Sequence, residues 1–273
     1  LNSKTGAVES ILDKELAREI VDREAAHGLN EPVVRWVQSG KVETAGEARI
    51  RKGAVGPVYG SLRVESAAPG CPQVIQEVIL YDKLKRIDLV NRVLKDSTPL
   101  LEVYFAFPFK VEKPQFAFEA SNSVIVPLKD QFPGSNSNYY SMQHWADVSD
   151  GRAGVALASV DAHLVEFGGL WPCYVSQAHH GVTPPGFGRK FVGAEEMVKG
   201  HMYSFVMDTN FRTNFQPVQQ ADILFRYSVT THRGTWKEGR PRDFGWAVSS
   251  PLLAVAVKGN KDGNLPKAMS FCT

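Results

Sequence analysis

Strict alternation of polarity over Glu102–Glu112 is the feature that most constrains how this chain can fold. One face of an extended segment would carry Val103, Phe105, Phe107, Phe109 and Val111. A period of two residues is typical of a β-strand with one face on a core, because a helix would spread these side chains around its surface. The segment is therefore predicted to be a half-buried antiparallel strand.

Shorter runs of alternating polarity recur along the chain between turn residues, among them 23 Gly and 16 Pro. This is the pattern of many strands joined by turns. Further strands are expected over Gln115–Ala120, Ser123–Leu128, Gly154–Ser159, His201–Asp208, Ala221–Thr230 and Pro251–Lys258, with a hairpin turn over Gly259–Asn264. Ala7–Asp22 and Val74–Asp96 carry apolar residues at helical spacing as well as at strand spacing. Periodicity leaves these two stretches undecided.

Charge and hydrophobicity exclude several classes of partner. The 31 basic and 29 acidic residues give a net charge of +2 without a long block of one sign, whereas nucleic-acid binding depends on clustered Lys and Arg. No stretch approaches the ~20 apolar residues of a membrane span. We therefore expect no nucleic-acid partner and no membrane partner.

The cysteines and the opening residues say little about the compartment. Cys71, Cys173 and Cys272 are far apart and form no Cys-x-x-Cys motif, so we expect neither a thiolate metal site nor a redox site. The opening lacks the basic and apolar regions of a signal peptide and looks like the interior of a longer protein. The sequence therefore predicts no particular cellular compartment.

Five segments, in order, resemble the C-terminal β-domain of glycoside hydrolase family 38, the α-mannosidases. No single segment is a diagnostic signature, but together they cover most of the chain. They are Asn2–Asp22, Lys85–Asp96, Glu102–Ala120 with the following Ser123–Leu128, Tyr139–Gly168 and Gly200–His232.

The resemblance implies an all-β fold, one domain over residues 1–273 that forms a large antiparallel β-sandwich. This supersandwich is also the galactose mutarotase-like fold, and it would make strands and turns of the two undecided stretches. The resemblance places catalysis in a separate N-terminal α/β domain that holds zinc through Asp and His and carries an Asp nucleophile. It therefore implies no catalytic residue, metal or cofactor in this chain, and two partners: a carbohydrate and the catalytic domain of the same protein.

Gln143–Gly151 carries the first candidates for carbohydrate binding. His144 and Trp145 stand beside Asp147 and Asp150. Indole stacks on a sugar ring, and carboxylates accept hydrogen bonds from hydroxyls. In the alternative interpretation Trp145 belongs to the core, and Asp150 closes a β-turn by bonding its own backbone.

Asp161 and His163 share one face of an extended segment and are candidates for the same role. This part of the chain is similar to an Asp-Arg-Arg run of many α-mannosidases, whose arginine can reach toward the active site. Here Ala162 and His163 replace the two arginines, which puts a substrate-contacting arginine in doubt. The alternative is an ordinary surface or core histidine.

Two more candidates lie in and near the Gly- and Pro-rich segment Gly168–Gly193. Trp171 is the aromatic residue first expected to stack on a sugar. His179 and His180 are adjacent, so on an extended chain they point opposite ways, and His180 is taken as the candidate. An ordinary surface loop is the alternative.

Arg212 and Asn214 complete the set, because with Asn210 they would form one polar face of an extended segment. Arg and Asn can together hold neighbouring hydroxyls. A buried polar ladder that positions loops is the alternative.

The leading functional hypothesis is a non-catalytic C-terminal domain of an α-mannosidase-like glycoside hydrolase, which packs on the catalytic domain and contributes to carbohydrate binding. The first alternative is a stand-alone enzyme of the aldose mutarotase or epimerase type. That chemistry needs a general base and a general acid, for which Glu166 with His163 or His144 could serve. A carbohydrate-binding or purely structural module is a further alternative.

Overall fold

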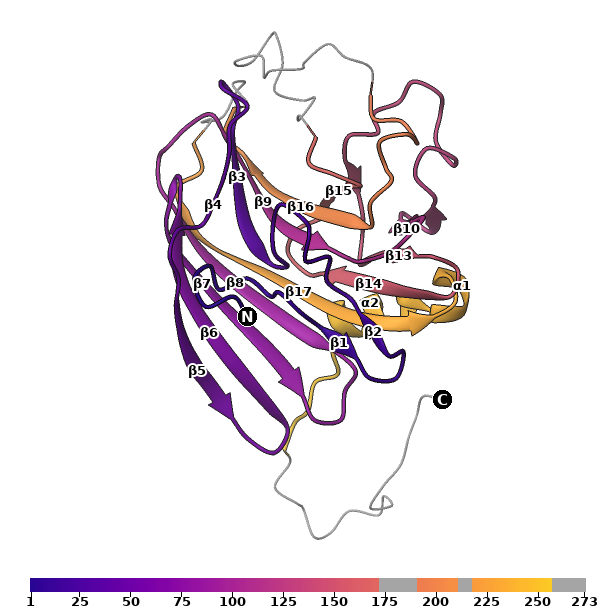
Figure 1. Cartoon of the computed structure of the whole chain (residues 1–273), viewed down its shortest axis with the longest axis horizontal. Helices are drawn as coiled ribbons and strands as arrows, with labels where there is room; N and C mark the ends of the chain where they lie inside the picture. Colours follow the sequence, from indigo (N-terminus) through magenta and orange to yellow (C-terminus); the bar gives the residue numbers. More distant parts are fainter. Residues whose placement is uncertain (172–190, 211–217, 257–273) are drawn as a thin grey trace.

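The structure is a computed structural model that describes residues 1–171, 191–210 and 218–256. Two antiparallel sheets pack face to face (Figure 1). The nine-stranded sheet has the order β11 (Ser123–Ile125), β10 (Gln115–Ala120), β13 (Trp145–Ser149), β14 (Ala153–Ser159), β17 (Ala221–Arg233), β8 (Ile87–Lys95), β7 (Cys71–Tyr81), β6 (Tyr59–Ala68) and β5 (Arg49–Val55).

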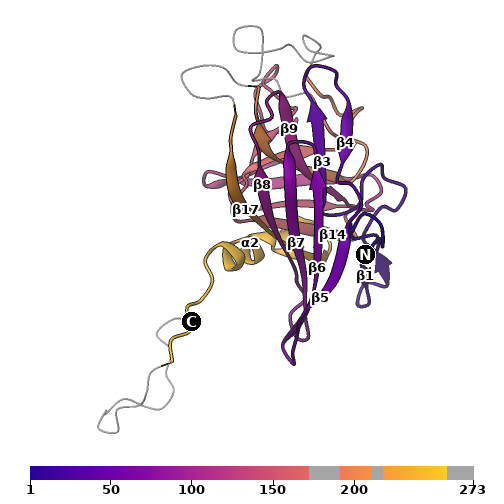
Figure 2. The same cartoon turned by 90° about the vertical axis from the view of Figure 1, so that its left-hand side faces the viewer.

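The six-stranded sheet has the order β12 (Tyr140–Ser141), β15 (Leu164–Phe167), β16 (His201–Asp208), β9 (Leu101–Pro108), β3 (Glu31–Trp36) and β4 (Val42–Thr44). A hairpin of β1 (Leu12–Asp13) and β2 (Arg18–Glu19) precedes it. The helices α1 (Trp236–Gly239) and α2 (Pro241–Ser249) follow β17. In Figure 2, α2 lies on one side of the nine-stranded sheet and the N-terminal segment lies on the other.

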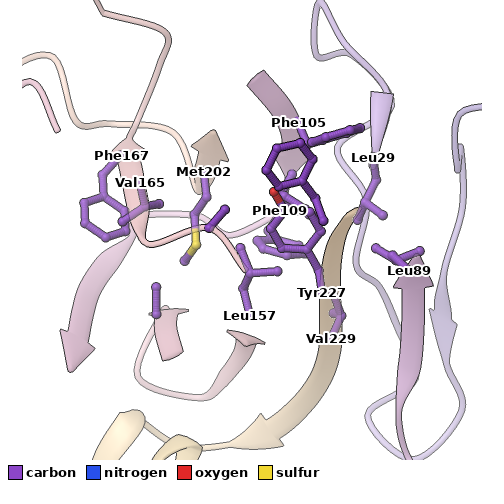
Figure 3. Close-up of a cluster of buried hydrophobic side chains, with 14 of the residues drawn as sticks. Leu29, Leu89, Phe105, Phe109, Leu157, Val165, Phe167, Met202, Tyr227 and Val229 are labelled. Carbon is purple, nitrogen blue, oxygen red and sulfur yellow. The ribbon is translucent and has the colours of Figure 1, made fainter. Parts of the chain in front are cut away.

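The core fills the space between the inner faces of the two sheets (Figure 3). Phe105 and Phe107 of β9 meet Tyr227 of β17, and the Phe107 and Tyr227 rings are 5.0 Å apart. All three side chains are fully buried. Each large apolar side chain removed from water contributes roughly 1.5–3 kcal/mol before the entropy cost is counted. The predicted apolar face of β9 is therefore confirmed as a centre of the core.

The second face of β9 is also buried, so the expectation of a half-buried strand is wrong. Tyr104 stacks on Phe205 with ring centroids 4.8 Å apart, and Tyr139 and Leu170 pack against this second cluster. The alternation of polarity correctly predicts a strand at β9. It does not reveal that segments outside the sheet cover the outer face of this strand.

The two undecided stretches form strands and turns, as the resemblance implied: β1 and β2 in the first, β7 and β8 in the second. The strand expected over Pro251–Lys258 is wrong for residues 251–256, which form no strand and leave Leu252 99% exposed. Helix α2 ends just before them, and no neighbouring strand pairs with them in the described structure.

The strand expected over Ser123–Leu128 ends earlier, at Ile125, where the backbone turns and the Lys129 amide donates to the Val126 carbonyl. The turn expected over Gly259–Asn264 lies outside the described residues. Neither helix of the described structure is long and apolar enough to cross a membrane.

Candidate functional site

A buried carboxylate cluster lies on the outer face of the six-stranded sheet. It consists of Arg35, Glu102, Tyr104 and Glu166. The register places Arg35 of β3 directly opposite Glu102 of β9, and Arg35 Nε donates to Glu102 Oε2 at 2.5 Å. The Tyr104 hydroxyl donates to the same carboxylate at 3.1 Å. Since both charged side chains are buried, each depends on the other for its stability in the interior.

Glu166 of β15 is the second carboxylate of this cluster and has no exposed surface. Its Oε2 accepts a hydrogen bond from the Trp171 amide at 2.6 Å. Burial, together with the nearby charge of Glu102, raises its pKa well above the ordinary value. Glu166 therefore holds a proton much more readily than an exposed glutamate.

A polar pocket of about 470 Å³ opens between residues 2–10 and 21–31. We call it the loop pocket. Asp22, His27 and Glu31 line it, and each is held by a partner. Asp22 Oδ2 lies 2.8 Å from His201 Nε2, and His27 Nδ1 lies 3.0 Å from the Tyr203 hydroxyl. The Gly28 amide donates to Glu31 Oε2 at 2.6 Å, so three polar groups are pre-positioned at one cavity.

Burial changes the acidity of these pocket groups. It raises the pKa of Glu31, although the hydrogen bond from Gly28 partly opposes this, and it lowers the pKa of His27. Burial also lowers the pKa of His201, against the attraction of Asp22. Perturbed acids and bases that line a cavity are a physical indication of a functional site.

The inner face of the nine-stranded sheet extends beyond the edge of the six-stranded sheet and leaves an apolar trough of about 550 Å³. Figure 1 shows the lower ends of β5, β6 and β7 without a second sheet over them. Leu12, Leu62 and Leu80 line the trough and are 62%, 38% and 56% exposed. Residues Val8 and Ser10 border both the trough and the loop pocket, so the two cavities lie on either side of one N-terminal segment.

His144 contacts protein groups in the structure. Its Nδ1 lies 2.7 Å from Glu119 Oε2, its ring lies 4.2 Å from that of Trp246, and Trp246 Nε1 donates to Glu119 Oε1 at 2.8 Å. These contacts attach α2 to the end of β10. Trp145 is 1% exposed and belongs to the buried interior beneath α2, where Gly245 approaches it. A Trp145 stacked on a sugar is incompatible with this burial.

Asp161 accepts two hydrogen bonds from the Arg226 guanidinium, both at 2.8 Å. His163 is exposed, with its Nδ1 3.2 Å from the carbonyl of Gln143. Trp171 is partly buried, packs against the core and donates from Nε1 to the Phe167 carbonyl at 2.9 Å. Asp161 and Trp171 thus have structural partners, whereas His163 is accessible.

The remaining predicted site residues, His180, Arg212 and Asn214, lie outside the described residues. The acid–base pair considered for a mutarotase is not brought together in the described structure, because Glu166 contacts neither His163 nor His144. Among residues 1–171, 191–210 and 218–256, no three His, Cys, Asp or Glu side chains are grouped to hold a metal.

Sequence reasoning missed the loop pocket. Asp22, His27 and Glu31 are spread over ten residues without a motif, and the carboxyl and imidazole groups meet only because the loop before β3 folds back against β16. Only the mixture of Asp, His and Glu in a loop before a strand was visible in the sequence.

Comparison with known proteins agrees with this architecture. A family model described as the glycosyl hydrolases family 38 C-terminal domain matches residues 1–165. An α-mannosidase from Enterococcus faecalis V583 is similar in structure, with a TM-score of 0.61 and 9% identity over 89% of this chain and 30% of that chain. A glycosyl hydrolase family 38 protein from Enterococcus faecalis gives a TM-score of 0.59 and 9% identity over 89% of this chain and 31% of that chain.

A galactose mutarotase-like protein from Lactobacillus casei ATCC 334 gives a TM-score of 0.46 and 11% identity over 85% of this chain and 96% of that chain. No curated protein sequence matches the chain. The Enterococcus structures share the fold, and the chain spans less than a third of their length. The predicted antiparallel β-sandwich is thus confirmed, and the family model, which matches more than half of the residues, shows that the chain belongs to the glycosyl hydrolase family 38 C-terminal domain family.

Proposed function

We propose that this chain acts as the non-catalytic C-terminal domain of an α-mannosidase-like glycoside hydrolase, packs on a separate catalytic domain and contributes to carbohydrate binding. The observation that carries the proposal is the apolar trough. Exposed apolar surface of this kind, continuous with a core, is typical of a surface that another folded domain covers. The family membership and the much greater length of the α-mannosidase structures support the catalytic domain as the occupant of the trough.

The composition of the trough favours a folded domain of the same protein over a charged ligand. Its lining is mainly aliphatic, with Lys52 as its one charged member among the described lining residues. The aliphatic side chains come from four strands of the nine-stranded sheet, β5 to β8, and from the N-terminal segment, so a complementary surface has to be broad. A large hydrophobic interface of this kind is what holds two domains of one chain in a fixed arrangement.

The first test is the coding sequence upstream of Leu1. A continuous reading frame that encodes a zinc-dependent α/β domain is the expected result, and the absence of such a domain would contradict the proposal. The isolated chain is expected not to hydrolyse an aryl α-mannoside, with or without added zinc. Turnover that copurifies with the chain would overturn the non-catalytic assignment.

The second test concerns the trough in the enzyme so encoded. The double variant Leu62→Asp, Leu80→Asp is expected to weaken docking, so that thermal unfolding separates into two transitions and α-mannosidase activity falls. Leu94→Asp, Leu224→Asp is the matched control, because these leucines are 42% and 41% exposed on the opposite face of the same sheet. Equal effects of both variants would contradict the proposal. So would a dimer of the isolated chain that the trough variant abolishes, since a second copy would then be the occupant.

A further inference from the structure

The loop pocket has the size and the polar groups of a small-molecule site. Its volume of about 470 Å³ lies within the usual range for ligand pockets. Asp22, His27 and Glu31 form part of its wall, and Asn2 and Glu9 face them from the N-terminal segment. Donors and acceptors therefore converge from both sides of the cavity.

The polar groups are held in place before any ligand arrives. Glu31 is 6% exposed and tied to the Gly28 amide, and Asp22 is tied to His201. His27 contacts Tyr203 through Nδ1, and Nε2 has no hydrogen-bond partner among the described residues. Groups fixed in this way lose little entropy on binding.

The charge of the wall selects against anions. Glu9 and Asp22 are acidic, and the one arginine among the described lining residues, Arg23, already lies 2.9 Å from Glu19. A phosphate or carboxylate would meet mainly acceptors of its own sign. Hydroxyl groups suit the wall, because each can donate to a carboxylate and accept from an imidazole or amide.

Burial also favours an uncharged ligand that carries hydroxyl groups, since it favours the neutral forms of Glu31 and His27. A neutral carboxyl group can both donate and accept a hydrogen bond, and Nε2 of a neutral His27 can either donate or accept one while Nδ1 contacts Tyr203. The position of the pocket adds to this, because it lies beside the segment that borders the apolar trough. Ligand sites occur preferentially where two domains meet.

We propose that the loop pocket, built by Asp22, His27 and Glu31 opposite Asn2 and Glu9, is a binding site for an uncharged mono- or disaccharide. The proposal deepens the proposed function, on which it rests for the class of ligand, by assigning the carbohydrate contribution of this domain to residues outside the predicted set. It places the sugar at the margin of the surface that the catalytic domain covers.

Titration of the isotope-labelled chain with methyl α-mannoside, followed by the backbone amide signals, tests the proposal. Saturable shifts are expected at residues 22–31, including the Gly28 amide. Glu31→Gln and His27→Ala are each expected to weaken binding about three- to tenfold, the effect of one lost hydrogen bond. Glu47→Gln is the matched control, because Glu47 is exposed and does not line the pocket. Urea midpoints of the variants verify that they are folded.

Mannose 6-phosphate forms the second arm and is expected to bind more weakly than the neutral sugar. Tighter binding of the phosphate would overturn the proposal. Saturable shifts confined to other residues, such as those around His144, would overturn the pocket assignment but leave the carbohydrate role of the domain standing. The absence of saturable shifts with both sugars would overturn the pocket assignment. Docking of the catalytic domain on the trough would still be tested by the Leu62→Asp, Leu80→Asp variant.

Discussion

His232 of β17 and Asp147 of β13 meet across the intervening strand β14, with His232 Nε2 2.5 Å from Asp147 Oδ2. The register explains how they reach each other. Asp147 lies opposite Ala156, and His232 lies opposite Gly154, so β14 presents only small residues between them. Helices α1 and α2 pack over this face, and Asp147 is completely buried.

Gly239→Ala is expected to destabilise the protein, although alanine usually favours a helix. A Cβ at Gly239 would lie 2.1 Å from His232 Nδ1, and overpacking of this kind costs about 1–3 kcal/mol. Urea denaturation measures the loss. In a His232→Ala background the same substitution should cost much less, because the side chain that it strikes is gone. Gly60→Ala is the control, since its Cβ meets nothing closer than 3.9 Å, and an equal loss there would contradict the explanation.

The same pair predicts how stability depends on pH. Burial would lower the pKa of His232, but the hydrogen bond and charge of Asp147 outweigh it and raise the pKa. A raised pKa in the folded state gives stability that is fully present below about pH 6.5 and is lost as pH rises through the folded pKa. In Asp147→Asn the partner charge is absent, and burial should lower the pKa of His232.

The Asp147→Asn variant should therefore gain stability relative to the wild type as pH rises through neutrality. Below pH 6.5 the free energy of unfolding of this variant is expected to be about 3 kcal/mol lower than that of the wild type, as for other buried ion pairs that lose one partner. Urea denaturation of both proteins between about pH 5 and 8 measures the difference, within the range over which histidines titrate. A difference that does not change with pH would show that the pair does not titrate.

Two buried glutamates on one sheet face should respond differently to the same substitution. Glu102→Gln leaves the Arg35 guanidinium buried without its counter-charge, which costs about 3–5 kcal/mol. Glu166→Gln retains an acceptor for the Trp171 amide and removes a carboxyl group whose ionisation burial opposes, so its cost should be within about 1–2 kcal/mol. Urea denaturation at pH 7 ranks the two, and a larger loss for Glu166→Gln would refute the roles given to them.

Local patterns in the sequence anticipated the sheets but not the surroundings of the strands. Val103 and Phe105 marked the inner face of β9, whereas the burial of Glu102 depends on Arg35, which is 67 residues away in the chain. Trp145 was a candidate for sugar stacking because an exposed and a buried tryptophan look alike in a sequence.

The helices were missed although a local signal for the first was present. Thr235 and Glu238 form a capping box at the start of α1, and Pro241 occupies the first turn of α2. No helix or strand is predicted between the strands expected over Ala221–Thr230 and Pro251–Lys258. The loop pocket could not be predicted, because it depends on how the loop before β3 lies against β16.

Asp150 shows that the turn interpretation of residues 149–151 is correct and leads to the last prediction. Its Oδ1 accepts hydrogen bonds from the Arg152 and Ala153 amides, both at 2.9 Å, and its Oδ2 lies 2.8 Å from Arg18. Burial opposes ionisation, but the Arg18 contact and the two amides outweigh it and lower the pKa of Asp150 to about 2.

A lowered pKa gives stability that is present above the unfolded value of about 3.9 and is lost as pH falls through the folded value. Asp150→Asn should therefore cost about 1–2 kcal/mol at pH 7, and the difference from the wild type should shrink as pH falls below about 4. Urea denaturation of both proteins at pH 7 and below about pH 4 measures this difference in stability. Arg18→Met should lose part of the same free energy, and the two losses should not add, because both substitutions break the contact that ties the β13–β14 turn to β2. Fully additive losses would mean that Asp150 stabilises the turn through its backbone bonds without help from Arg18.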